Sequence, residues 1–382
     1  MKILTFSTFY FPGYKGGGPI KTISNLFSYG EKNMEYYLLT SDRDLGDSQE
    51  YSSVECGAWN ALDNVDVFYV QTGLKGYKQI FNILRKSDYD LIYINSFFSF
   101  RFSIYPQLLA MFMKQKIVLG PRGEFSDGAL RLKPIRKKVF ISVYKLIGLH
   151  YGTVFQASSK FEAEDIRKAL GPKVDIQLAE DIGSQDFAKT VITRSSNALK
   201  GVFVSRISPM KNLLWALKTL KSCKDSVVYH IYGPIEDHKY WGECERVIND
   251  LPQHIQVEYK GELKPDQVIL VMAKYDFFFM PTMGENYGHA IVEALCSGLP
   301  ILISDATPWR DLQEKGIGWD LPLYNQDLFN FAIHQLALMT IEEHYQMRKH
   351  ILLWARQMFS QPDSIEANLN MFRYAYDKRN DN

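Results

Sequence analysis

The chain has 382 residues, of which 46% are hydrophobic and 14% aromatic. This length suggests two domains of ordinary size, and the composition is sufficient for each to bury a core. The formal net charge is only +1 at pH 7. A global electrostatic field that would attract nucleic acid is therefore excluded, and we expect no nucleic-acid partner.

Hydropathy and cysteine usage are typical of a cytoplasmic protein without a membrane span. No segment approaches the roughly 20 consecutive apolar residues that a transmembrane helix requires. The apolar start, Met1–Phe11, runs into Pro12-Gly13 without a small-residue cleavage site, so we interpret it as a first strand. The cysteines are scattered and form no CxxC motif, which is typical of reduced, buried thiols. They are Cys56, Cys223, Cys244 and Cys296.

A glycine cluster follows the first predicted strand, Lys2–Phe9. Gly16, Gly17 and Gly18 lie between that strand and a predicted helix, Ile20–Tyr29. Glycines at such a junction let the backbone approach a ligand closely and expose its N–H groups, so Gly17 and Gly18 are candidate binding residues. The spacing is not GxGxxG, and a flexible turn is an equally good interpretation of the cluster by itself.

An acidic motif, Asp42-Arg43-Asp44, lies in the next polar loop. It matches a D-x-D pattern that often holds a metal ion in some enzymes of another fold. Because the motif lies in a polar loop that is crowded with further acids, we expect no metal site there.

Three further apolar runs in the first half predict parallel strands whose carboxyl ends lie at one edge of a sheet. The second run ends at Asn95, and the third is followed by Arg122, so both residues are candidates for a site at that edge. For Arg122, a structural salt bridge with Glu124 or another acid is an equally good interpretation. The three runs are Val65–Val70, Leu91–Asn95 and Lys116–Leu119.

Arg131–His150 is the most basic part of the chain and contains no acid. Its apolar residues recur at helical spacing, which predicts one amphipathic helix. Such a helix could lie on an anionic membrane surface or present a solvated basic face, and we favour membrane contact. The cations are Arg131, Lys133, Arg136, Lys137, Lys138 and Lys145, and the apolar residues are Leu132, Ile135, Val139, Val143 and Leu146.

The polar stretch Ser184–Leu199 is predicted to be a linker, after which strands and helices alternate again. A strand, Gly201–Ser205, is followed by Arg206, and Ser208-Pro209 has the pattern of an N-cap and first helical position. Lys211 is then predicted in the first helical turn, where its charge opposes the helix dipole. Arg206 and Lys211 together would suit a diphosphate, with a planar fork and a mobile point charge. The alternative is that both cations pair with acids or solvent.

The most informative stretch follows the apolar run Tyr275–Met280, which predicts a buried strand. Beyond a short polar loop, a helix is predicted to begin near Tyr287 or Gly288 and to end at the left-handed cap Gly298. Open α/β sheets bind ligands where a strand's carboxyl end meets a helix. The N–H groups and the dipole at the helix start favour an anion.

Two carboxylates bracket this helix start with the spacing E-x7-E. Glu285 lies in the loop and Glu293 in the second helical turn. The spacing alone is common by chance, and both residues could be ordinary solvated acids. The context of a buried strand, a glycine-rich loop and an apolar helix favours a functional role for both.

The end of the chain predicts two helices. Thr340 and Glu343 form a capping box for a long helix that reaches about Phe359, and Pro362 breaks it. The stripe of a last helix is Ile365, Leu369, Phe372 and Tyr376.

Taken together, the motifs resemble a retaining glycosyltransferase of the GT-B fold, in the large family 4 of "group 1" transferases. The resemblance covers nearly the whole chain and is strongest over Gly201–Leu323. The segments ILISDATPW and GIGWDLPL resemble a sub-branch associated with polysaccharide assembly. The motifs are Gly17-Gly18, the R-x4-K of Arg206 and Lys211, Gly233 after its strand, and ENYGHAIVEALCSGLP from Glu285.

The resemblance implies an α/β fold of two Rossmann-like domains whose parallel sheets face each other across a cleft. It places an acceptor-binding domain at residues 1–190 and a nucleotide-sugar-binding domain at 191–361. A carboxyl-terminal helix at 362–382 would cross back to the first domain. Asn95 and Arg122 would lie on the acceptor side, where many relatives carry a histidine, and the absence of that histidine leaves the donor sugar open.

By the same resemblance, Glu285, Arg206 and Lys211 are the catalytic residues. Glu285 would contact the donor sugar near its reacting carbon, and the two cations would stabilise the leaving diphosphate. Glu293 would accept hydrogen bonds from the ribose hydroxyls. Cations and N–H dipoles can carry this charge stabilisation, so neither a metal ion nor a cofactor is expected beside the nucleotide diphosphate sugar. The remaining donor-binding residues are Asn286, Tyr287, Gly288, His289, Ala290, Gly233, Gly17 and Gly18.

The predicted function is transfer of a hexose from a UDP- or GDP-sugar to a growing polysaccharide or polyprenyl-diphosphate-linked acceptor, as in O-antigen, capsule or exopolysaccharide synthesis. We expect the protein in the cytoplasm, peripheral on the inner face of the membrane through Arg131–His150. One alternative is a GT-B nucleotide-sugar epimerase, although no convincing set of additional acid–base residues is seen. Another is a catalytically idle scaffold for membrane or a partner enzyme, against which the intact charged residues argue.

Overall fold

The computed structural model describes residues 1–29, 33–86, 88–131, 133–183, 186–194, 198–360 and 363–378. The chain forms two compact units, which we call unit 1 (Met1–Ile182 with Pro362–Asn382) and unit 2 (Gly183–Gln361). The first crossing between them therefore lies after Ile182, earlier than the predicted boundary at residue 190. Pro362, where a break is predicted, and parts of the predicted linker Ser184–Leu199 lie outside the described residues.

Unit 1 is built on an eight-stranded sheet in the order β3-β4-β2-β1-β5-β6-β7-β8. The pairings are parallel except that β3 runs antiparallel to β4. The central strand β5 is buried along its whole length, as its uninterrupted apolar sequence requires in a parallel sheet. The strands are β1 (Lys2–Ser7), β2 (Glu35–Ser41), β3 (Trp59–Leu62), β4 (Val65–Val70), β5 (Leu91–Asn95), β6 (Ile117–Gly120), β7 (Thr153–Ala157) and β8 (Asp175–Leu178).

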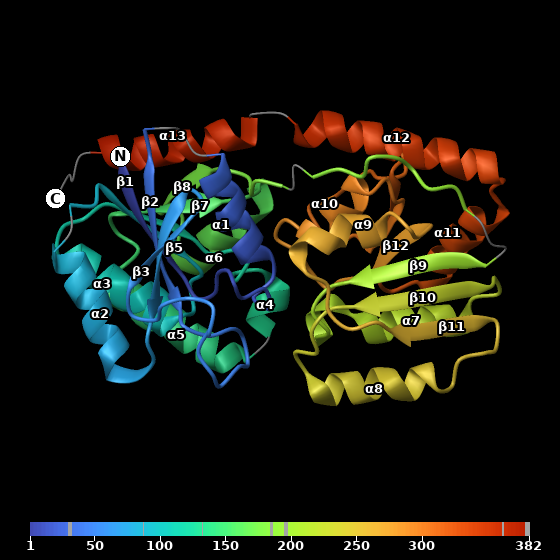
Figure 1. The fold of residues 1–382 in the computed structure, drawn as a ribbon, viewed down its shortest axis with the longest axis horizontal. Helices are drawn as coiled ribbons and strands as arrows, with labels where there is room; N and C mark the ends of the chain where they lie inside the picture. Colours follow the sequence, from blue (N-terminus) through green and yellow to red (C-terminus); the bar gives the residue numbers. More distant parts are fainter. Residues whose placement is uncertain are drawn as a thin grey trace. The chain divides into compact units, whose positions relative to one another are not determined.

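Helices cover both faces of this sheet, and each face has its own hydrophobic core (Figure 1). One core joins Ile23 of α1 and Phe372 of α13 to residues of the central strands. The other joins apolar residues of α2, α3, α5 and α6. The helices are α1 (Gly18–Ser28), α2 (Gly73–Lys86), α3 (Tyr105–Phe112), α4 (Asp127–Arg131), α5 (Pro134–Ile147), α6 (Lys160–Leu170) and α13 (Asp363–Asp377), with a π-helical turn at Phe100–Ile104.

Unit 2 is built on a six-stranded sheet in the order β11-β10-β9-β12-β13-β14, with all pairings parallel. The apolar run of β12 lies at its centre and is completely buried, as predicted for a strand covered on both faces. The strands are β9 (Leu199–Val204), β10 (Val227–Tyr232), β11 (Ile255–Tyr259), β12 (Phe277–Met280), β13 (Ile301–Ser304) and β14 (Gly318–Leu321).

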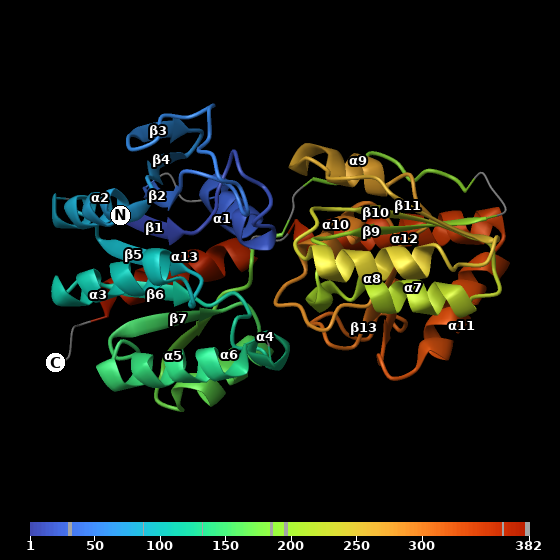
Figure 2. The same cartoon turned by 90° about the horizontal axis from the view of Figure 1, so that it is seen from below.

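The helices of unit 2 form two contacting groups (Figures 1 and 2). In one group α7 packs against α8 and α11, and in the other α10 packs against α9 and α12. The predicted capping box of Thr340 and Glu343 is confirmed at the start of α12. The helices are α7 (Leu213–Ser222), α8 (His238–Ile248), α9 (Val268–Met272), α10 (His289–Cys296), α11 (Gln326–Leu338) and α12 (Ile341–Phe359), with 3-10 turns at Pro209–Lys211 and Pro265–Gln267.

The predicted single helix over Arg131–His150 is wrong. Helix α4 ends at Arg131, Lys133 adopts a left-handed conformation with φ 59°, and α5 begins at Pro134. The break follows from Pro134, because a residue before proline is disfavoured in the α region whereas proline itself suits the first helical position. Leu132 of the predicted apolar stripe lies outside the described residues.

Candidate functional site

Three neighbouring loops meet at the carboxyl edge of the unit 2 sheet. Strands β10, β9 and β12 are adjacent and parallel, so the loops that follow them emerge side by side. The β9–α7 loop carries Arg206 and Lys211, the β10–α8 loop carries Gly233, and the β12–α10 loop carries Glu285. This edge is where open parallel sheets bind ligands.

Lys211 and Glu285 form a close, largely buried ion pair at this edge. The Lys211 Nζ lies 2.5 Å from the Glu285 Oε1, and the two side chains are only 14% and 10% exposed, respectively. An ion pair this far removed from water is screened little, so each group strongly constrains the position of the other. The predicted catalytic acid and the predicted diphosphate-binding lysine are therefore brought together.

Backbone and side-chain hydrogen bonds join the two loops that carry this pair. The Met283 N–H donates to the Met210 carbonyl at 2.8 Å, and the Thr282 Oγ1 donates to the same carbonyl at 3.1 Å. The Asn212 Nδ2 donates to the Pro281 carbonyl at 2.9 Å. Lys211 and Glu285 are thus held by one continuous network rather than by two independent loops.

The predicted place of Lys211 in the first turn of a long helix is wrong. Pro209–Lys211 is a separate 3-10 turn, and Asn212 follows in a left-handed conformation with φ 59°. Helix α7 begins only at Leu213, and Ser208 makes no side-chain capping bond. Asparagine adopts the left-handed conformation at lower cost than most residues. From this position the Asn212 side chain donates to the carbonyl of Pro281, which directly follows β12. Lys211 therefore projects from a tight turn before the helix.

The amino terminus of α10 has the features of an anion site. Gly288 precedes the helix with φ 81°, a left-handed conformation that residues with a side chain rarely adopt, so glycine is favoured at this position. The N-cap residue Gly288 has no side chain that could cap this helix, and the first helical turn contains no acid. The N–H groups and the dipole of His289 and Ala290 favour a negative charge there.

An aromatic cluster fixes the segment that leads into α10. The Trp309 Nε1 donates to the Tyr287 carbonyl at 2.6 Å, and the two rings lie 6.1 Å apart. The Tyr287 ring also contacts that of His289 at 5.0 Å. We assigned no role to Trp309 from sequence. In the sequence, Trp309 is a single aromatic residue shortly after β13, and such an isolated residue is too weak a pattern to predict a role.

Glu293 is a buried carboxylate. It lies in the second turn of α10 and is 6% exposed, so the alternative that it is a solvated surface acid is wrong. Burial raises the pKa of the Cys296 thiol, and the nearby negative charges of Glu293 and Asp186 raise it further. The thiol therefore remains protonated and unreactive at neutral pH. A carboxylate that is costly to bury and lies one helical turn from the anion site is a strong functional candidate.

Arg206 contacts an acid that we did not single out from sequence. Its Nη1 lies 2.9 Å from the Glu236 Oε2, with the two side chains 33% and 38% exposed, respectively. Gly233 brings their loops together, because a Cβ there would lie 1.9 Å from the Ser205 carbonyl oxygen. Gly233 is therefore required for close backbone packing. Among the described residues, the backbone of Gly233 makes no hydrogen bond to Lys211 or Glu285.

Arg348 donates hydrogen bonds at the carboxyl end of α10, and the sequence analysis did not single it out. This buried guanidinium donates to the carbonyls of Gly298 at 3.0 Å, Ala273 at 2.9 Å and Ile192 at 2.8 Å. Gly298 follows α10 and Ala273 follows α9, so one cation satisfies the carboxyl ends of two helices. Burial lowers the pKa of Arg348 to about 10.

In unit 1, Gly17 and Gly18 lie at the start of α1. Gly17 is the N-cap residue, with φ 74° and no side chain to cap the helix, and Gly18 is the first helical residue. The preceding loop is held by Asp44, whose carboxylate accepts hydrogen bonds from the N–H groups of Tyr14 at 2.8 Å and Lys15 at 3.2 Å. The second acid of the D-x-D motif is therefore engaged in positioning this glycine loop.

Arg122 and Asn95 belong to a buried polar network. The Arg122 guanidinium pairs with Asp181 and donates to the Asn95 Oδ1 at 3.0 Å and to the Gln156 Oε1 at 3.1 Å. Gln156 in turn donates to the Asn368 Oδ1 of α13 at 2.9 Å. These contacts support the structural alternative for Arg122, with Asp181 rather than Glu124 as the acid.

Helix α5 presents an exposed apolar stripe between cations. Ile135, Val139 and Leu146 are exposed, and their spacing puts them on one side of the helix. Lys138 and Lys145 flank the stripe and are exposed as well. Lys137, in contrast, turns inward, donating to the Ala129 carbonyl at 2.7 Å and lying 4.8 Å from the Phe98 ring centre.

Residues 185–351 match the family model described as "Glycosyl transferases group 1". The match includes the three loops at the edge of the unit 2 sheet. Whole-chain likeness to solved structures extends beyond it. HepE of Anabaena, solved in complex with UDP and glucose, has a TM-score of 0.71 at 17% identity and covers 98% of each chain. The chain has the GT-B fold.

Two further structures share this GT-B architecture. Sucrose-phosphate synthase of Thermosynechococcus elongatus has a TM-score of 0.71 at 13% identity, covering 97% of this chain and 98% of that one. WaaG, a glycosyltransferase involved in lipopolysaccharide biosynthesis, has a TM-score of 0.67 at 12% identity and covers 98% of both chains. At these identities the likeness shows the fold, and the predicted GT-B fold is confirmed.

One curated relative matches over a short stretch. The sulfoquinovosyl transferase SQD2 of Arabidopsis thaliana is 30% identical over 105 residues, which is 28% of this chain and 19% of that protein. The matched stretch thus spans less than a fifth of the relative's length. Together with the group 1 match, it supports the predicted resemblance to glycosyltransferases at that coarser level.

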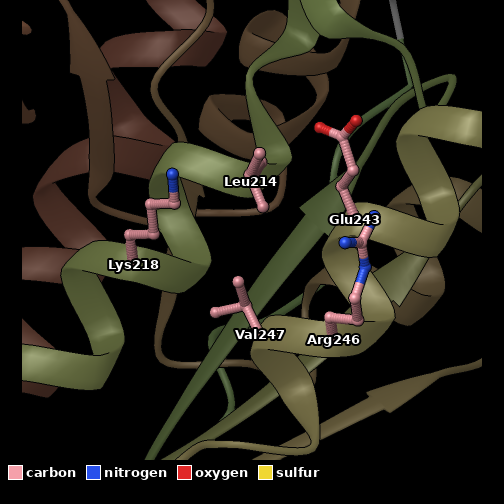
Figure 3. Close-up of a pocket in the computed structure, with 5 residues that line it drawn as sticks. All are labelled: Leu214, Lys218, Glu243, Arg246 and Val247. Carbon is pink, nitrogen blue, oxygen red and sulfur yellow. The ribbon is translucent and has the colours of Figure 1, made fainter.

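Other features of the GT-B chain lie apart from the candidate site. A hollow of about 310 Å³ lies between α7 and α8 and is lined by no candidate residue. Figure 3 shows the side chains that line it. Among the described residues, no helix is both long and apolar enough to cross a membrane. The same part of the chain holds no cluster of three His, Cys, Asp or Glu residues suited to a metal ion. The hollow is lined by Leu214, Lys218, Glu243, Arg246 and Val247.

Proposed function

We propose that this protein is a retaining glycosyltransferase that moves a hexose from a nucleotide diphosphate sugar to a growing glycan. The observation that carries the proposal is the Lys211–Glu285 contact at 2.5 Å, in the loop network that leads to the amino terminus of α10. An ammonium group, helix N–H groups and a carboxylate at one sheet edge suit a substrate that joins a diphosphate to a sugar.

The chemistry assigned to each group follows from the charge that develops in the reaction. When the bond between the anomeric carbon and the diphosphate breaks, negative charge grows on the leaving oxygens. Lys211, Arg206 and the N–H groups at the start of α10 are fixed donors that stabilise this charge. Glu285 lies against Lys211 and would contact the sugar near its reacting carbon. With these cations in place, we propose that the reaction needs no metal ion.

Glu293 completes the donor site in this proposal. Its carboxylate lies in the second turn of α10, so a nucleotide whose phosphates bind the helix start would bring its ribose near this acid. This carboxylate would accept hydrogen bonds from two ribose hydroxyls. The backbone of residues 286–290 would hold the phosphates and the sugar.

Known proteins support the donor and acceptor classes that we propose. HepE has been solved with UDP and glucose, and WaaG is named for lipopolysaccharide biosynthesis. We therefore propose a UDP- or GDP-hexose as donor and a lipid-linked or growing polysaccharide as acceptor, within family 4 of the retaining transferases. Gly17 and Gly18 of unit 1 are proposed to assist donor binding.

We further propose that α5 contacts the inner face of the cytoplasmic membrane. The exposed Leu146 and Ile135 would enter the interface while Lys138 and Lys145 contact anionic headgroups. This contact would bring the enzyme to a polyprenyl-linked acceptor without a membrane-spanning segment.

A ligand screen followed by two variants tests the proposed function. Thermal shift with UDP, GDP, dTDP and their sugars identifies the donor, because a ligand specific for the folded state raises stability. Glu285→Ala and Lys211→Ala should each lower transfer by about 100-fold or more while the protein stays folded. Asp250→Asn, which changes an exposed acid paired with Lys221, should leave transfer unchanged.

Full activity of both site variants would contradict the assignment of the site. Conversion of the donor to an epimer without an acceptor would support the epimerase alternative instead. Loss of activity on chelation of metal ions would contradict the metal-independent mechanism.

A further inference from the structure

Each of the two cations assigned to the diphosphate contacts a carboxylate in this structure. Lys211 contacts Glu285, and Arg206 contacts Glu236. Glu285 already has a role in the proposed reaction, whereas Glu236 has none. We propose that Glu236 competes with the donor diphosphate for Arg206 and thereby sets nucleotide affinity and the rate at which the nucleoside diphosphate product leaves. This inference rests on the proposed function.

The backbone fixes Glu236 beside Arg206. The Ile207 N–H donates to the Pro234 carbonyl at 2.8 Å, and the Glu236 N–H donates back to the Ile207 carbonyl at 3.2 Å. A parallel bridge also pairs Ile207 with Ile235. Because both residues adjoin this small ladder, the acid and the guanidinium remain within reach of each other whether or not their ion pair is made.

The two ion pairs differ in how easily an anion can replace the carboxylate. The Arg206–Glu236 pair is about one-third exposed on each side, whereas the Lys211–Glu285 pair is 14% and 10% exposed. Exposed pairs contribute little to stability, and buried pairs are costly to break. A diphosphate would therefore displace Glu236 from Arg206 first and reach Lys211 second.

Glu236 can return to solvent once it is displaced, because its side chain is 38% exposed. The start of the following helix, α8, is capped by Asp237, whose carboxylate accepts a hydrogen bond from the Tyr240 N–H at 3.0 Å. Glu236 therefore has no competing partner at that helix start, and Arg206 is its ion-pair partner among the described residues. After the glycosyl bond breaks, return of Glu236 to Arg206 would weaken the grip on the diphosphate and speed its release.

Competition of this kind acts on ligands that carry a diphosphate and not on the nucleoside. Glu236→Gln removes the competing charge while keeping the shape of the side chain. UDP, GDP and dTDP are each titrated into the wild-type protein and the variant by calorimetry, alongside uridine, guanosine and thymidine. Whichever nucleotide binds the wild-type protein should bind the Glu236→Gln variant about two- to fivefold more tightly. The affinity for the corresponding nucleoside should be the same in both proteins.

Two further measurements separate competition from other roles of the acid. In an Arg206→Ala background, Glu236→Gln should give no gain, because the group for which they compete is absent. The gain should also shrink as the salt concentration rises. In the matched control Asp250→Asn, an exposed ion pair is removed from the end of α8 and nucleotide affinity should not change.

The outcomes distinguish this inference from the proposed function. Equal or weaker nucleotide binding by Glu236→Gln, with normal binding by the wild-type protein, overturns the role of Glu236 alone. Weaker binding would show that the acid orients Arg206 for the ligand. A gain that persists in the Arg206→Ala background also overturns the competition. A wild-type protein that binds none of the three nucleotides overturns both proposals.

Discussion

The Arg348 Nε donates a hydrogen bond to the Gly298 carbonyl at 3.0 Å, just beyond the carboxyl end of α10. The opposite end of the same helix is where we place the diphosphate. Arg348 therefore fixes the carboxyl end of the helix by donating to the Gly298 carbonyl. We propose that this contact also keeps the N–H groups at the amino terminus of α10 oriented toward the donor diphosphate.

Arg348→Met should destabilise unit 2 by about 3 kcal/mol, because several buried carbonyls lose a charged donor. Arg356→Met on the same helix is the matched control, since the Arg356 side chain is exposed and, within the described ranges, donates one hydrogen bond, at 2.9 Å to the Ala188 carbonyl. We expect that variant to lose about 1 kcal/mol. Urea unfolding followed by tryptophan fluorescence gives both values. Equal losses would contradict the special position of Arg348.

Gly233→Ala should destabilise unit 2 by about 2–4 kcal/mol, because the added methyl would collide with the Ser205 carbonyl oxygen. Gly284→Ala is the control, since its nearest neighbour to an added Cβ is 3.9 Å away. That change should stay within about 0.5 kcal/mol. The comparison uses thermal unfolding of both variants. A tolerated alanine at 233 would refute the close packing of the β9 and β10 loops.

The stability of unit 2 should fall as the pH decreases below about 6.5. Burial lowers the pKa of His344 from its ordinary value of 6.5, with Arg348 and Arg194 adding to this effect and Asp276 opposing it. The unfolded chain then takes up a proton that the folded protein resists, so acid favours unfolding. His344→Gln should flatten the melting temperature between pH 7 and 5, whereas the exposed His350→Gln should retain the wild-type slope.

Arg122→Met should destabilise unit 1 by about 3–5 kcal/mol, because Asp181 would be left as a buried, unpaired charge. Nucleotide binding by unit 2 should remain unchanged, as expected of a structural residue. Hydrogen exchange of β6 and α13 reports the loss. Lys15→Met removes an exposed pair with Asp47 and should change stability by no more than about 1 kcal/mol. Selective loss of acceptor use, with normal stability, would restore the binding role of Arg122.

Leu146→Glu should weaken binding to vesicles that contain an anionic lipid, because a charge replaces the most exposed apolar side chain of α5. Leu146 is 87% exposed, and the control Leu338→Glu changes a leucine of α11 that is 71% exposed. Cosedimentation with phosphatidylglycerol vesicles measures both. Equal retention by the two variants would show that α5 does not contact the membrane.

The sequence predicts the elements of this fold well where apolar runs are continuous. β4 and β5 begin and end at the predicted residues, because both are largely buried and their sequences are mostly apolar. The antiparallel β3 was not predicted. It is an edge strand with alternating exposure, so its apolar signal is weak.

The candidate site was predictable in its motifs and not in its contacts. The sequence correctly locates Lys211 and Glu285 at one sheet edge, because parallel strands direct their following loops to the same side. It misplaces the start of α7, since the left-handed conformation of Asn212 leaves no sequence signal. Glu236 and Arg348 were missed because their partners are distant in sequence and are chosen by tertiary packing.

The return of α13 to unit 1 determines the order in which the chain can fold during synthesis. Asn368 and Phe372 complete the hydrogen bonding and the core around Gln156 and Tyr93, yet they are made after every residue of unit 2. A ribosome therefore releases a whole unit 2 before the first unit can close its core. During that interval the apolar face of β5, β6 and β8 stays open to solvent, and it is the surface that a chaperone would have to shield.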